Sequence, residues 1–83
     1  MKVVQVPLNL IVPNPDQPRK YFTDDELKEL TQSIKNYGVL QPLLVKRNGM
    51  KSFFLIAGER RYRAAKLAGL ERVPVLIKEF SEK

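Results

Sequence analysis

The alternation of apolar and polar residues predicts four short strands. Apolar runs occupy residues 3–6, 42–47, 51–57 and 73–77, and Pro, Gly or Asn bounds the first three. Short apolar runs with such boundaries are typical of strands in a buried sheet. Asn48-Gly49 separates two of the runs, which indicates a hairpin. Pro74 lacks a backbone donor, which favours a sheet edge or the first residues of its strand.

The first of two predicted helices begins at Thr23 and ends before Gly38. Thr23 and Glu26 have the spacing of a capping box, and Gly38 is suited to a left-handed C-terminal cap. One apolar stripe runs along this helix, formed by Leu27, Leu30, Ile34 and Tyr37. Before the helix, residues 8–12 continue apolar, and three prolines within 13–18 predict a stiff extended loop. We interpret this first helix as core scaffold.

The second helix follows Gly58 directly, at the end of the apolar run 51–57. Its predicted buried face contains Ala64, Leu67 and Ala68, and Gly69 ends it. The predicted order is therefore β-α-β-β-α-β. We expect residues 1–83 to form a single α+β domain, with a small mixed sheet and two packed helices.

Three arginines, Arg60, Arg61 and Arg63, lie on the opening turn of the second helix. Cations at a helix N-terminus are unfavourable by roughly 0.3–1 kcal/mol each when exposed, so their presence there indicates a function. Free backbone N–H groups collect at a helix start, and guanidinium groups fit phosphate oxygens in pairs. The pattern predicts an anion site. The alternative is a solvated basic helix start whose arginine stems cover apolar surface.

Composition excludes several classes of chemistry. The 83 residues contain no cysteine and no histidine, which excludes disulfides, thiolate chemistry, the usual zinc ligands and the usual general base. No apolar run approaches the roughly 18–20 residues that span a bilayer, and no signal peptide is recognised. We therefore expect a cytoplasmic protein without membrane contact.

The positive charge is concentrated in the second half of the chain. The net charge is +6, and residues 1–45 contribute none of it because their five basic and five acidic side chains cancel. All of the excess lies in residues 46–83, around the Gly58 junction. This distribution favours an anionic partner, a nucleotide or a nucleic acid.

Two polar positions outside the arginine turn are further candidates. Gln17 and Arg19 lie in the proline-rich loop, where they could face a ligand, although a spacer loop explains them better when taken alone. Gln41 lies at the mouth of the predicted hairpin. Its amide could contact a base edge, and it could equally bond the loop backbone.

Three motifs together resemble the N-terminal domain of ParB chromosome-partitioning proteins, within the ParB/sulfiredoxin-like superfamily. They are Asn-Pro-Asp-Gln-Pro-Arg at 14–19, Gly-Val-Leu-Gln-Pro-Leu-Leu-Val at 38–45, and Gly-Glu-Arg-Arg-Tyr-Arg-Ala-Ala at 58–65. Their order and spacing also agree, and the resemblance covers almost the whole chain.

The resemblance implies binding of cytidine triphosphate (CTP) with Mg²⁺ and its slow hydrolysis. It implies that the loop 38–42 holds cytosine and ribose, with Gln41 facing the base. The phosphates would lie on Gly58, on Arg60 and on Arg61 or Arg63, close to Arg19. Glu59 and Gln17 would be the candidates for assisting magnesium or the attacking water. Positioning and charge neutralisation dominate phosphoryl transfer, which needs no histidine.

One expected motif does not occur in this sequence. Family members carry Glu-Asn-x-x-Arg on a following helix, and then a helix-turn-helix region and a dimerisation domain. We therefore expect this chain to be a fragment or a short relative. DNA binding, self-association and contact with a ParA-type ATPase would belong to the parent protein, at the nucleoid in the cytoplasm.

Three other functions are compatible with the sequence. The first is a ParB-like kinase of free amino acids, with Glu59 as base. The second is a non-specific nucleic-acid binder that uses the basic region 46–72. The third is a dimerisation module without a ligand. Sulfiredoxin activity is excluded because it needs a cysteine.

Overall fold

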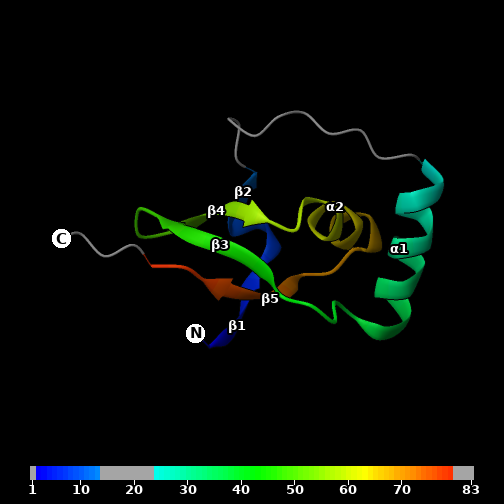
Figure 1. Cartoon of the computed structure of the whole chain (residues 1–83), viewed down its shortest axis with the longest axis horizontal. Coiled ribbons are helices and arrows are strands. Elements are labelled where there is room, and N and C mark those ends of the chain that lie inside the picture. The colour runs from blue at the N-terminus through cyan, green and yellow to red at the C-terminus, as the bar shows by residue number, and fades with distance from the viewer. Residues whose placement is uncertain (1, 14–23, 80–83) are drawn as a thin grey trace.

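A five-stranded mixed sheet forms the centre of the fold (Figure 1). This computed structural model describes residues 2–13 and 24–79. The spatial order of the strands is β1-β5-β3-β4-β2. β1 pairs antiparallel with β5 and β3 antiparallel with β4, whereas the pairs β3–β5 and β2–β4 are parallel. The strands are β1 (Val3–Pro7), β2 (Ile11–Pro13), β3 (Leu43–Asn48), β4 (Ser52–Ala57) and β5 (Arg72–Ile77).

The core lies on one face of this sheet, under the second helix. The fully buried side chains of the inner strands β3 and β5 are its centre: Leu43, Val45, Val73 and Val75. They alternate with less buried neighbours, as strand geometry requires. α2 (Glu59–Ala68) adds Tyr62 and Ala65 to the same cluster. The predicted α+β class with a mixed sheet and two helices is confirmed.

The strand β2 is an addition that the sequence did not predict. A short 3₁₀ helix, η1 (Leu8–Leu10), follows β1 and turns the chain so that β2 lies beside β4. β2 has only three residues and ends at Pro13, so it carries no alternating pattern of its own. Its pairing depends on a distant partner, and local sequence does not report such a contact.

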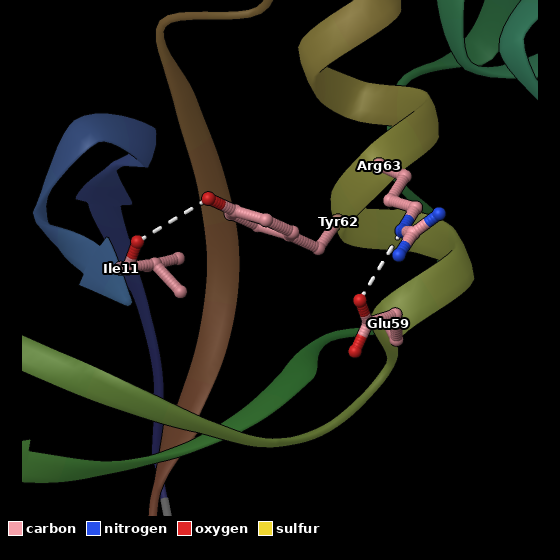
Figure 2. A network of polar contacts seen from close by, with 4 residues as sticks. All are labelled: Ile11, Glu59, Tyr62 and Arg63. Carbon is pink, nitrogen blue, oxygen red and sulfur yellow. Dashed lines mark hydrogen bonds and ion pairs between the residues drawn. The ribbon is translucent and has the colours of Figure 1, made fainter. Parts of the chain in front are cut away.

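Tyr62 ties α2 to this part of the sheet. Its ring is buried, and its hydroxyl donates a hydrogen bond of 3.4 Å to the carbonyl oxygen of Ile11 at the start of β2 (Figure 2). In the sequence, Tyr62 lies between Arg61 and Arg63 of the basic helix start. The structure shows instead that it belongs to the core, on the side of α2 that faces the sheet.

The predicted helices are present, but two of their apolar positions are exposed. α1 (Asp24–Tyr37) packs against α2, which lies between α1 and the sheet (Figure 1). Ile34 is buried as predicted, whereas Tyr37 is 72% exposed because it is the last residue before the chain turns at Gly38. Leu67 is 63% exposed. It lies outside the buried face of α2, which consists of Tyr62, Ala64 and Ala65. The predicted cap at Thr23 lies outside the described residues.

Pro74 occupies an inner strand and not an edge. β5 lies between β1 and β3, but its pairing with β3 begins only at Val75. Pro74 therefore precedes the ladder with β3 and pairs with Gln5 of β1 alone. The alternative, a position among the first residues of the strand, is the one observed. Within the described segments, neither helix is long and apolar enough to cross a membrane.

We predict that Gly58→Ala destabilises the fold more than Gly69→Ala. Both glycines have positive φ, 103° and 81°, where a non-glycine residue costs roughly 1–2 kcal/mol. A Cβ at Gly58 would also lie 2.7 Å from Cδ2 of the buried Leu43, whereas none of the described atoms lies within 4 Å at Gly69. Chemical denaturation of both variants measures the difference. Equal losses of unfolding free energy would show that the contact with Leu43 contributes nothing.

We predict that Tyr62→Phe costs little and Tyr62→Ala costs much. The hydroxyl bond is long at 3.4 Å, so its loss is expected to cost about 1 kcal/mol or less. Removal of the buried ring leaves a cavity and is expected to cost about 3–5 kcal/mol. Urea unfolding monitored by circular dichroism compares the two variants. A large loss in Tyr62→Phe would assign the hydroxyl, and not the ring, the main role.

Candidate functional site

A cavity of about 610 Å³ opens where three segments meet. The first is the inner side of α1, with Leu30, Ser33 and Ile34. The second is the connection that follows α1, and the third is the start of α2. The residues of these two segments that line the cavity are Gly38, Val39, Leu40, Gln41, Gly58, Glu59, Arg60 and Arg61. One wall is therefore mainly apolar and neutral, and the opposite wall is basic.

Gly58 sets the direction in which α2 begins. Its φ of 103° and ψ of 31° turn the chain sharply from β4 into the helix, and no side chain caps the helix start. The first helical hydrogen bond runs from the Tyr62 amide to the Gly58 carbonyl at 2.8 Å. The amides of Glu59, Arg60 and Arg61 thus have no partner within the helix. They lie at the positive end of the helix dipole, beside the cavity.

Arg61 connects the two walls of the cavity. Its Nη1 donates hydrogen bonds to the carbonyl oxygen of Pro42 at 2.8 Å and to that of Gln41 at 3.2 Å. These carbonyls belong to the connection between α1 and β3, nineteen and twenty residues earlier in the chain. Within the described residues, Nε and Nη2 of the same guanidinium group form no hydrogen bond.

Arg60 and Arg63 differ in their surroundings. Arg60 is exposed and lines the cavity. Arg63 does not line it, and its Nε instead forms an ion pair of 3.2 Å with Oε2 of Glu59 (Figure 2). This pair lies along the helix at i, i+4 spacing, where such pairs stabilise a helix by roughly 0.2–0.5 kcal/mol. Glu59 is thereby held against a cation at the rim of the site.

The structure brings together most of the residues predicted from the sequence. Gln41, Gly58, Glu59, Arg60 and Arg61 line one cavity, although the two segments are far apart in the chain. Arg63 does not line the cavity and pairs with Glu59 of this group. Gln17 and Arg19 lie outside the described residues, so their roles stay predictions.

Sequence reasoning missed the contribution of α1. We interpreted this helix as scaffold, yet its Leu30 and Ser33 line the cavity. They are three residues apart and so share a helix face, which was the available signal. The sequence does not show that this face of α1 lines the cavity. It does so because the chain turns at Gly38, with left-handed backbone geometry, and returns along the same side of the helix.

Acidic residues are sparse around the cavity. Glu59 is the one carboxylate among its described lining residues, and the described parts of the chain contain no group of three or more Asp, Glu, His or Cys side chains that could hold a metal. A divalent cation bound here would therefore take most of its ligands from a bound phosphate compound and from water.

The comparison with known families identifies the chain. The family model for the ParB N-terminal domain matches residues 1–83. The chromosome-partitioning protein Spo0J of Thermus thermophilus is 53% identical over 81 residues, which are 98% of this chain and 30% of that protein. The chain thus spans less than a third of the length of this relative.

Solved structures of known proteins have a similar fold. Caulobacter crescentus ParB, C-terminally truncated and complexed with CTP-γ-S, has a TM-score of 0.88 and 39% identity, and the match covers 99% of this chain and 47% of that one. The same protein complexed to the centromeric parS site has a TM-score of 0.87 and 41% identity, covering 95% and 42%. Sulfiredoxin from Arabidopsis thaliana has a TM-score of 0.82 at 25% identity, covering 96% and 88%.

The resemblance in the three motifs is therefore confirmed over the full sequence and over the described fold. With its five-stranded mixed sheet, two packed helices and a glycine-turned basic helix start, the chain belongs to the ParB N-terminal domain family.

Proposed function

We propose that this domain binds a nucleoside triphosphate, CTP, in the cavity between α1, the connection 38–41 and the start of α2. The observation that carries the proposal is the division of the cavity into a basic wall with free backbone donors and a neutral wall with amide and hydroxyl groups. A nucleotide has the same division, with a polyanion at one end and a neutral base at the other. The relative from Caulobacter that shares this fold at 39% identity holds CTP-γ-S.

The phosphates are assigned to the basic wall. The amides of Glu59, Arg60 and Arg61 and the dipole of α2 favour an anion, and Gly58 has no side chain to obstruct its approach. Arg60 is the exposed guanidinium group on this wall, and it supplies the paired donors that fit phosphate oxygens. Arg63 does not line the cavity, so we assign it to the orientation of Glu59 and not to a phosphate.

The base and ribose are assigned to the neutral wall. Gln41 offers two donors and one acceptor, and the Ser33 hydroxyl offers one donor and accepts as well. Leu30, Val39 and Leu40 supply the apolar surface on which a base can lie. A cytosine presents an amino group beside a ring nitrogen and a carbonyl, and this mixed edge suits amide and hydroxyl partners.

Magnesium and hydrolysis are the finer parts of the proposal. Mg²⁺ would enter with the triphosphate, which supplies most of its oxygen ligands, and Glu59 is the described carboxylate near enough to support it or an attacking water. Gln17 and Arg19 are proposed to act at the same triphosphate. The parent protein is proposed to act on the chromosome, with DNA, a second copy and a ParA-type ATPase as partners.

We expect calorimetric titration of the chain with CTP and Mg²⁺ to show binding, and parallel titrations with ATP, GTP and UTP to show weaker binding. Selective binding follows from the donors and acceptors on the neutral wall. Equal affinity for all four nucleotides would contradict base recognition and favour a purely electrostatic anion site. No heat of binding with any nucleotide at millimolar concentration would contradict the function proposed for this chain.

We expect Arg60→Ala to weaken CTP binding by roughly tenfold to a hundredfold, since a charge-assisted hydrogen bond contributes about 1.5–3 kcal/mol. The matched control is Arg47→Ala, which removes the same charge from an exposed arginine of β3 that does not line the cavity. The β3–β4 hairpin extends away from both helices (Figure 1). The same titration compares them, with thermal unfolding to verify that both variants are folded. Equal weakening in both would show that net charge, and not the helix start, attracts the nucleotide.

A further inference from the structure

We infer that Arg61 is a positioning residue that holds the base-binding wall against the phosphate-binding wall, and that it thereby determines base selectivity. This inference rests on the proposed nucleotide binding. It assigns Arg61 a role different from that of Arg60, although the two arginines are adjacent in sequence and chemically identical.

The first step is the reach of the Arg61 side chain. Its Nη1 carries two hydrogens and forms two hydrogen bonds, to the carbonyl oxygens of Gln41 and Pro42. Both carbonyls belong to the short connection that carries Val39, Leu40 and Gln41 into the cavity. The guanidinium group therefore fixes the backbone from which the neutral wall is built.

The second step concerns what else holds this connection. At its start the Gly38 amide donates to the Ile34 carbonyl at 2.8 Å, and at its end Leu43 enters β3 and is fully buried. Between these anchors Leu40 is 77% exposed and Gln41 is exposed as well. Val39 packs against the core, whereas the part of the connection that follows it has little packing of its own. Among the described residues, the two hydrogen bonds from Arg61 link this later part to α2.

The third step is the geometry of the guanidinium group. It is planar, and while Nη1 binds the two carbonyls, Nε and Nη2 can donate to an anion from another edge. A phosphate at the start of α2 would bind the same planar guanidinium group of Arg61 that holds the connection. Lysine keeps the charge but has no rigid fork, so it cannot hold two adjacent carbonyls and a phosphate in one fixed arrangement.

The test compares Arg61→Lys with Arg60→Lys, the same substitution one position apart. Calorimetry measures the affinities for CTP and UTP, and the ratio of the two is the diagnostic quantity. Loss of one net hydrogen bond corresponds to roughly a three- to tenfold change in an equilibrium constant. We expect Arg61→Lys to lower the ratio by that factor. We expect Arg60→Lys to weaken both nucleotides equally and to leave the ratio unchanged.

A second readout needs no ligand. Backbone ¹⁵N relaxation of the free chain reports the order of the Val39, Leu40 and Gln41 amides on the picosecond-to-nanosecond timescale. We expect lower order parameters there in Arg61→Lys and wild-type values in Arg60→Lys. Thermal unfolding verifies that both variants are folded.

The outcomes separate this inference from the proposed function. An unchanged CTP-to-UTP ratio in Arg61→Lys, with equal loss for both nucleotides, would make Arg61 a simple phosphate ligand and overturn the inference. Unchanged order parameters at 39–41 would overturn it as well. If the wild-type chain does not discriminate between CTP and UTP, the proposed base recognition fails, and the relaxation data alone decide whether Arg61 holds the connection.

Discussion

The passage of the chain from β4 into α2 at Gly58 is the constraint on which the rest of the site depends. The positive φ of Gly58 turns the helix start toward the connection 38–41, and the absence of a Cβ lets this turn lie directly over the buried Leu43. Leu43 is the first residue of β3, into which the chain passes after this connection. One close contact therefore fixes both how α2 begins and where the neutral wall of the cavity ends.

From this junction the three arginines acquire different surroundings. Arg60 lines the cavity, Arg61 donates to the backbone of the opposite wall, and Arg63 pairs with Glu59 along the helix. Their cost at a helix N-terminus is thereby partly offset. Arg61 interacts with carbonyl dipoles, and Arg63 interacts with the one acidic side chain of the first turn. Among the described residues, Arg60 is the least compensated of the three arginines, and it is the one that the proposed function assigns to the triphosphate.

The sequence predicted elements whose signals are local. The Asn48-Gly49 hairpin and the strand–glycine–helix junction at Gly58 carry their own turn chemistry, and both are present. β2 was missed because three residues beside Pro13 become a strand only through pairing with β4. Leu67 was assigned to the wrong face because its spacing from Ala64 and Ala68 fits one stripe, whereas the buried side of α2 is set by the sheet on one side and α1 on the other.

The residues of the candidate site were predicted from the sequence to about the same extent as the fold. Gly58 and the arginines were predicted as site residues because their residue types are unusual at these positions. Ser33 did not, because a serine within an amphipathic helix has no distinctive pattern and its role depends on the placement of α1. The bonds from Arg61 to Gln41 and Pro42 could not be predicted either, since they join segments that only the fold brings together.

The most direct test of this account is the pattern of chemical-shift changes when CTP and Mg²⁺ are added to the ¹⁵N-labelled chain. The account predicts that backbone amides at 38–41 and 58–61, together with Ser33 on α1, shift first and most, while the hairpin amides at 46–52 stay unchanged. Changes centred on the basic hairpin, with the Gly58 junction unaffected, would contradict it.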